Sequence, residues 1–313
     1  MRGTGLALLL AVLLPGMAAA QARPKVVAVK SAALAPYASV IAGFRAEANA
    51  DVQEVMLDES STAAARVFKT LVLQKPSLVL AIGPLAANAA RRSLSEDIPV
   101  LFVMVPYFEK YGLEGPNVTG IALTSDYTPE LGALKAMVPK AKRVGILHDP
   151  RFSAKQVQAA QEAASAVGLT VVPLAVEAQG KVEKVLGGAE GKVDALLMVA
   201  DKTVANAAVV QALIAFATEQ KIPLVGLTSS QVKEGATLSL APSPTSIGQQ
   251  AGRLANRIIH EKVNPGALAV AQPEGMDLAI SLTAARKLSS SCDATLELLR
   301  YAAKQDFPVK VHE

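Results

Sequence analysis

The strongest constraint on the fold of this chain is a regular alternation of short, mostly apolar segments with longer helical patterns. In the first half, the apolar segments span residues 26–29, 52–56, 78–82 and 100–105. Helical patterns fill the intervals at residues 37–49, 62–74 and 85–94. Short segments that are apolar on both faces are typical of buried parallel strands. Their alternation with helices predicts an α/β lobe, in which helices cover both faces of a parallel sheet.

The second half of the chain repeats this pattern. Further strands are expected at residues 144–147, 170–173, 195–199, 224–227 and 236–240, with helices between them. Ile98-Pro99 and Ile222-Pro223 each begin a strand, where proline is tolerated because it has no N–H to donate. Since the chain has 313 residues and a domain has roughly 150, we expect two similar Rossmann-like lobes. A single open sheet of about ten strands is the alternative, at the upper end of the usual size.

The boundary between the predicted lobes lies near a turn at Gly115-Pro116-Asn117, followed by an extended segment over residues 118–123. We assign residues 23–120 and 245–268 to lobe 1, and residues 121–244 and 269–313 to lobe 2. The later elements expected are a long helix at 245–261, a last strand at 278–282 and a tail that ends in a helix at 294–304. Two or three crossings of the chain between lobes would form a hinge that permits bending while limiting twisting.

The first twenty residues have the pattern of a secretory signal peptide. Arg2 supplies a positive charge, residues 6–14 are an unbroken apolar run, and three alanines at 18–20 suit a signal peptidase. A membrane anchor is the alternative, but the apolar run is far shorter than the roughly 20 residues that a spanning helix needs. We expect cleavage near Ala20 and a soluble periplasmic protein. Cys292 is the only cysteine, so neither a lipid anchor at the cleavage site nor an internal disulfide is expected, and its thiol is predicted to be half-buried.

Composition and motifs exclude several classes of function. The net charge of +4 is too small and too dispersed for a nucleic-acid partner. Residues 187–192 resemble a phosphate loop, but the spacing is one residue short and Val193 replaces the magnesium-binding Ser or Thr. The sequence contains no G-x-S-x-G or G-x-G-x-x-G motif and no cysteine pair for a metal. We therefore expect no enzyme, cofactor or metal, and interpret His148 as an exposed polar residue before a turn, with a ligand group as the alternative.

Small and polar residues gather where the predicted strands end, which is where open α/β sheets bind ligands. The candidate ligand-binding residues are Ser31, Gly83, Tyr107, Asp149, Phe152, Asp201 and Ser229. Gly83-Pro84 opens a helix whose free N–H groups would suit an anion. The Asp201 carboxylate would suit an amino group, or alternatively caps a helix near Thr203. A capping box from Ser153 to Gln156 predicts the start of another helix, which Gly168 ends.

The same regions resemble a known family. The segments Asn117-Val-Thr-Gly, Lys142-Arg-Val-Gly-Ile-Leu and Leu268-Ala-Val-Ala-Gln-Pro, followed by residues 277–288, are similar to the ABC-transporter substrate-binding proteins that include tryptophan- and tyrosine-binding members. The resemblance covers nearly the whole chain after the signal. It implies a periplasmic-binding-protein fold of type 1 with three crossings, and delivery of ligand to a membrane permease. Ser281 stands where that family usually has Asn.

One loop departs from the family pattern. Residues 105–110 read Val-Pro-Tyr-Phe-Glu-Lys, where the family usually has Asp-Pro-Val and a glycine. The ligand therefore need not be an aromatic amino acid. Our hypothesis is a monomeric receptor that captures an amino acid or a similar small polar or carboxylate solute and passes it to an ABC permease. The alternative is a sensor or scaffold of the same fold that partners a membrane kinase or an envelope complex.

Overall fold

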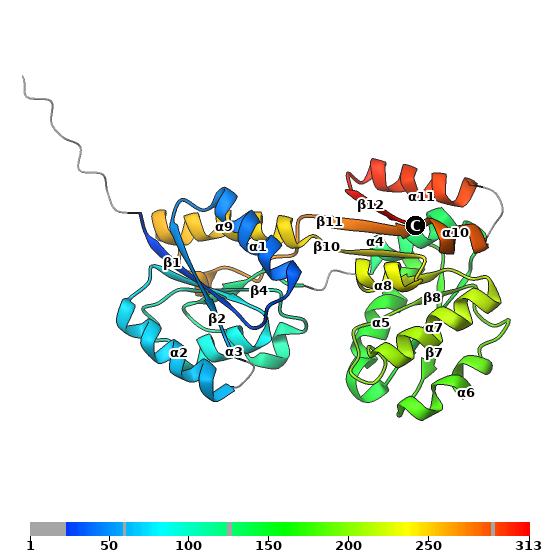
Figure 1. Cartoon of the computed structure of the whole chain (residues 1–313), viewed down its shortest axis with the longest axis horizontal. Coiled ribbons are helices and arrows are strands. Elements are labelled where there is room, and N and C mark those ends of the chain that lie inside the picture. The colour runs from blue at the N-terminus through cyan, green and yellow to red at the C-terminus, as the bar shows by residue number, and fades with distance from the viewer. Residues whose placement is uncertain (1–22, 59–60, 124–126, 289–291) are drawn as a thin grey trace, which may run out of the picture.

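The computed structural model describes residues 23–58, 61–123, 127–288 and 292–313 and shows two α/β lobes side by side (Figure 1). The predicted signal peptide falls outside these ranges. Among the described residues, no helix has the length and apolar character needed to cross a membrane.

Lobe 1 is built on a five-stranded parallel sheet with the order β2-β1-β3-β4-β5. Its strands are β1 (Lys25–Lys30), β2 (Asp51–Met56), β3 (Leu78–Ile82), β4 (Val100–Val103) and β5 (Val118–Gly120). Helices α1 (Ala35–Glu47) and α9 (Pro244–His260) cover one face, and α2 (Ser61–Gln74) and α3 (Pro84–Ser93) cover the other. Every residue of β3 is buried because helices lie on both sides of it, which explains its unbroken apolar run.

Lobe 2 is built on a seven-stranded sheet with the order β12-β11-β10-β9-β8-β6-β7. Its strands are β6 (Arg143–His148), β7 (Thr170–Ala175), β8 (Ala195–Leu197), β9 (Leu224–Gly226), β10 (Leu238–Pro242), β11 (Met276–Ser281) and β12 (Val309–His312). Helices α4 (Thr128–Met137), α5 (Pro150–Ala166), α10 (Leu282–Leu288) and α11 (Asp293–Lys304) contribute to the core on one face. Helices α6 (Val182–Gly187), α7 (Ala207–Gln220) and α8 (Ser229–Glu234) contribute to the core on the other. The predicted fold class, two helix-flanked and mainly parallel sheets, is confirmed.

Two local predictions are wrong, and a third is confirmed in part. Helix α5 begins at Pro150, where Asp149 accepts the Arg151 backbone N–H as N-cap, but its backbone is not helical at Ser153 (φ −132°, ψ 20°), so the predicted helix start at Ser153 coincides with a kink between two helical stretches. The tail does not end in a helix, since β12 follows α11 and pairs in parallel with β11. Cys292 is exposed rather than half-buried.

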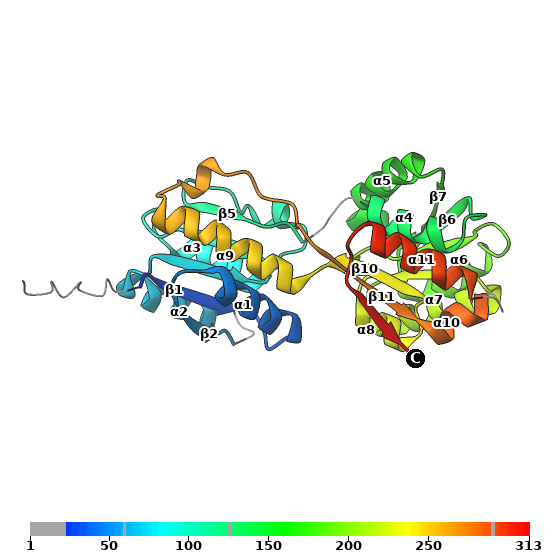
Figure 2. The same cartoon turned by 90° about the horizontal axis from the view of Figure 1, so that it is seen from above.

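The three passages between the lobes are hydrogen-bonded to one another. The first leads from β5 to α4, the second from β10 to α9, and the third from the short helix η3 (Pro265–Ala267) to β11. In the third passage, Ala271 accepts from the Ala122 N–H at 2.9 Å, and Gly275 accepts from the Ser243 N–H at 2.9 Å. The third passage therefore pairs with both of the others, and Figure 2 shows β10 and β11 running together toward lobe 1.

Helices α1 and α9 are far apart in sequence but approach each other through glycines. A Cβ atom on Gly43 would lie 2.2 Å from the Thr245 carbonyl oxygen, and one on Gly248 would lie 2.1 Å from the Val40 carbonyl oxygen. No side-chain rotation relieves a clash with backbone. The helix that re-enters lobe 1 through the hinge is thus held in place by backbone-to-backbone packing.

We predict that Gly248→Ala lowers the free energy of unfolding by about 1–3 kcal/mol, because the added methyl group forces α1 and α9 apart. Urea denaturation measures this change. Gly180→Ala is the matched control, since a Cβ there meets nothing within 4 Å. Equal stability of the two variants would contradict the packing argument.

Candidate functional site

The carboxyl ends of the parallel strands face the opposite lobe in both sheets. In lobe 1, β5 runs parallel to β4 and leads directly into the first passage. In lobe 2, β10 runs parallel to β9 and leads into the second. The loops after these strands therefore meet between the lobes, where ligands bind in folds of this class.

In lobe 1, Ser31 and Gly83 form a closely packed unit after β1 and β3. The buried Ser31 hydroxyl donates to the Ile82 carbonyl oxygen at 2.9 Å and accepts from the Ala86 N–H at 2.9 Å. Gly83 has a φ of 90°, and a Cβ there would lie 2.3 Å from the hydroxyl of buried Tyr37. Only glycine fits this position. The sequence suggested that the free N–H groups at the start of α3 could bind an anion. One of them, the Ala86 N–H, instead donates to the Ser31 hydroxyl oxygen.

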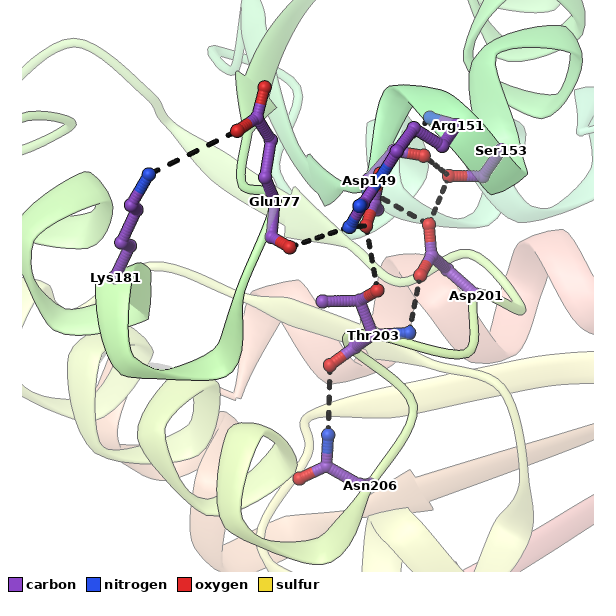
Figure 3. A network of polar contacts seen from close by, with 8 residues as sticks. All are labelled: Asp149, Arg151, Ser153, Glu177, Lys181, Asp201, Thr203 and Asn206. Atoms are coloured by element: carbon purple, nitrogen blue, oxygen red, sulfur yellow. Dashed lines mark hydrogen bonds and ion pairs between the residues drawn. The ribbon is translucent and has the colours of Figure 1, made fainter.

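In lobe 2, two buried aspartates tie the loop after β6 to the loop after β8 (Figure 3). Asp149 is fully buried and accepts from the Arg151 Nε at 2.9 Å and from the Thr203 hydroxyl at 2.8 Å. Asp201, 4% exposed, accepts from the Asp149 N–H at 2.8 Å, the Thr203 N–H at 2.7 Å and the Ser153 hydroxyl. We call these five residues the aspartate network. Asp201 thus caps the turn at Thr203, which is close to the helix-capping role that the sequence offered as the alternative to ligand binding.

The two carboxylates of the network differ in charge balance. Asp149 is paired with the Arg151 guanidinium at 2.5 Å. Asp201 accepts hydrogen bonds from neutral donors, and no ion pair is formed with it within the described part of the chain. Burial, together with the negative charge of Asp201, raises the pKa of Tyr107 to about 12. The field of Asp201 therefore reaches a residue of lobe 1.

His148 is a buried residue that our sequence interpretation placed on the surface. It is 6% exposed, and its Nδ1 atom lacks a hydrogen-bond partner among the described residues. Burial lowers its pKa, while the charges of Asp201 and Asp149 act in the opposite direction. The interpretation as an exposed residue is wrong because the alternation along β6 places His148 on the face of Val144 and Ile146, which pack in the core.

Two candidate aromatic residues lie at the contact between lobes. The Tyr107 hydroxyl donates to the carbonyl oxygen of Ala200, next to Asp201, at 2.5 Å. Phe152 is 41% exposed at the start of α5, with the Arg151 guanidinium 5.5 Å from its ring centroid. The structure therefore brings Tyr107 and Phe152 to the aspartate network.

Ser229 has a different environment. It is the first residue of α8, and its hydroxyl is hydrogen-bonded to His312 Nε2 at 2.8 Å. His312 lies in β12, the strand that the sequence analysis missed. The hydrogen bond of the Ser229 hydroxyl is therefore made to the edge strand β12 and not to the aspartate network.

We predict that Asp201→Ala lowers the free energy of unfolding by about 2–4 kcal/mol, because two buried donors and one partly buried donor lose their acceptor. Asp201→Asn keeps one carbonyl acceptor in place and is expected to cost roughly half as much. Urea denaturation of both variants tests this ordering. Wild-type stability of the alanine variant would show that the network does not hold the two loops.

Asp149 predicts a pH dependence of stability. Hydrogen bonds from Arg151 hold the pKa of Asp149 well below its ordinary value of 3.8. A lowered native pKa stabilises the folded state above the unfolded pKa, and this contribution is lost as the pH falls through 3.8 toward the native value. We expect the stability advantage of wild type over Asp149→Asn to shrink between about pH 5 and about pH 2. Thermal unfolding of both proteins measures it, and a constant difference would contradict the assignment.

Comparison with known proteins identifies the family. The family model described as ABC transporter substrate binding protein matches residues 39–305. The tyrosine-binding protein of Clostridioides difficile (strain R20291) is 27% identical over 222 residues. That alignment covers 68% of this chain and 62% of the relative, so the match spans less than two thirds of the relative's length.

Solved structures establish the same fold. The ligand-free, open structure of a Clostridium difficile substrate-binding protein with adhesive properties is 21% identical, with a TM-score of 0.76, and covers 93% of this chain and 100% of that chain. An ABC domain from Streptococcus pneumonia in complex with L-Trp is 19% identical, with a TM-score of 0.61, and covers 87% and 98%. The fold is that of the type 1 periplasmic binding proteins.

The family and these neighbours are binding proteins, which confirms the prediction that the chain is not an enzyme. Substrate-binding proteins of this family are extracytoplasmic. The match over most of the described fold, together with two helix-flanked sheets joined by three passages, shows that the chain belongs to the family of ABC transporter substrate-binding proteins.

Proposed function

We propose that this protein captures an amino acid, or a similar small solute with a cationic amino group, between its lobes and delivers it to an ABC permease. The observation that supports this most is the buried Asp201 carboxylate, which forms no ion pair among the described residues and lies beside the contact with lobe 1. A ligand ammonium group would compensate that charge. The unpartnered Nδ1 of His148 offers a further hydrogen-bonding group on the same lobe.

The seven candidate residues are not supported equally. Phe152 and Asp201 are favoured as ligand contacts because they lie where the lobes touch, and Tyr107 is favoured as the residue of lobe 1 that reaches this contact. Ser31, Gly83 and Asp149 are engaged in internal bonds or packing, and we propose that they shape the walls of the site. Ser229 has the weakest support because its hydroxyl bonds to His312.

We further propose the lobe limits suggested by the sequence, residues 23–120 with 245–268 and residues 121–244 with 269–313. The membership of the two sheets supports them. Export by a signal peptide cleaved near Ala20, a periplasmic location and a monomeric state complete the proposal. The extracytoplasmic character of the family supports the location.

A thermal-shift assay tests the proposed function. The protein is unfolded and refolded to remove any retained ligand, then screened against the L-amino acids, with L-tyrosine and L-tryptophan first because relatives bind them. A ligand that binds only the native state stabilises it by about 2.7 kcal/mol at a hundredfold excess over Kd.

The amino-group requirement has its own control. The N-acetyl derivative of a stabilising amino acid keeps the side chain and carboxylate but loses the positive charge, so we expect no shift from it. Equal shifts from both forms would contradict the role of Asp201. No shift from any amino acid would contradict the proposed ligand class and favour the sensor or scaffold alternative.

A further inference from the structure

The loop after β4 is held firmly in lobe 1. It contains the short helix η1 (Phe108–Tyr111), and the Phe108 ring lies 5.4 Å from that of buried Phe102. Met104 and Tyr107 have positive φ angles of 58° and 52°, which are unfavourable for residues other than glycine. Such conformations persist where the surrounding contacts determine them. The loop is therefore a shaped projection rather than a loose connection.

This projection contacts lobe 2 at two points. The Tyr107 hydroxyl donates to the Ala200 carbonyl oxygen at 2.5 Å, and Lys110 Nζ donates to the Phe152 carbonyl oxygen at 3.4 Å. The Lys110 ammonium also lies 4.6 Å from the Tyr107 ring centroid, within range of a cation–π interaction. The two contacts therefore support each other.

Both acceptors on lobe 2 sit beside the aspartate network. Ala200 directly precedes Asp201, and Phe152 directly precedes Ser153. Because Asp201 bonds to Ser153 and to the Asp149 N–H, the two carbonyl groups are presented by loops that are tied together. The positions of the Ala200 and Phe152 carbonyl groups are thus set by bonds within lobe 2 and do not depend on the contact with lobe 1.

We propose that Tyr107 and Lys110 form a latch that holds the two lobes in the arrangement of this structure, and so sets ligand affinity through the population that must rearrange on binding. Both bonds join protein groups directly, so their contribution to this arrangement does not depend on a bridging ligand. Apparent affinity rises with the fraction of molecules in the binding-competent arrangement. Tyr107 and Lys110 act here as positioning residues. The latch itself does not depend on the proposed function, but its effect on ligand affinity does.

The test measures the distance between lobes in refolded protein without added ligand. Spin labels are placed at Leu73→Cys in α2 and Ala159→Cys in α5, both exposed positions, in a Cys292→Ser background. Double electron–electron resonance then gives the distribution of distances. Tyr107→Phe removes only the hydroxyl group, and we expect it to broaden the distribution and shift it away from that of wild type.

Tyr111→Phe is the matched control. Tyr111 ends the short helix that Tyr107 caps, and among the described residues its hydroxyl forms no hydrogen bond. Lys110→Met keeps the aliphatic stem and is expected to shift the distribution in the same direction as Tyr107→Phe. Thermal unfolding confirms that each variant is folded. A Tyr107→Phe distribution identical to that of wild type overturns the latch.

Affinity for a stabilising amino acid provides the second readout, with Tyr107→Phe expected to change the apparent Kd about fivefold, because the population that must rearrange on binding changes. A role in ligand contact alone would change the Kd but leave the ligand-free distances unchanged, which also overturns the latch. Since the distances require no ligand, a failed ligand screen leaves this test intact and separates the two proposals.

Discussion

The structure of lobe 2 at its contact with lobe 1 depends on one buried carboxylate. Asp201 follows β8 and accepts hydrogen bonds from the backbone of the loop after β6 and from its own turn. A buried anion is costly, and here three neutral donors and the nearby Arg151 guanidinium stabilise it. The arrangement fixes two loops from separate strands beside the point where Tyr107 of lobe 1 bonds to the Ala200 carbonyl oxygen.

The hinge determines how this site is used. The third passage between the lobes is bonded to the other two, so the lobes are joined by a narrow, hydrogen-bonded bundle of extended backbone. The buried Gln250 of α9 adds to it, because its Nε2 donates to the Gln272 carbonyl oxygen at 2.8 Å. Such a hinge allows the lobes to approach by bending while their faces stay aligned. A ligand that contacts both lobes then shifts the population toward the closed arrangement.

Much of the fold was predictable from the sequence because it depends on burial. The segments that became β3 and β6 are apolar since helices cover both faces of their sheets, and this pattern appears directly in the residues. Strand β12 was missed because its residues are mainly exposed at a sheet edge and lack that pattern. The sequence located the break in α5 at Ser153, but it showed neither the helical turn before it, which starts at Pro150, nor the bond of the Ser153 hydroxyl to Asp201.

The candidate site was less predictable, since it depends on which polar groups find partners in three dimensions. Sequence placed Asp149 and Asp201 at strand ends, but their bonds to each other's loops depend on the adjacency of β6 and β8. The burial of His148 was available in principle from its alternation with Ile146 along β6. The hydrogen bond between Ser229 and His312 could not be predicted, because His312 lies in β12, a strand without an apolar pattern in the sequence.

The central claim is that a ligand with an amino group closes the two lobes around itself. Small-angle X-ray scattering of the refolded protein, with and without a saturating amino acid that raises its melting temperature, tests this most directly. We predict a smaller radius of gyration in the presence of the ligand. Saturated binding with an unchanged radius of gyration would contradict the account, because the ligand would then occupy a site that does not join the lobes.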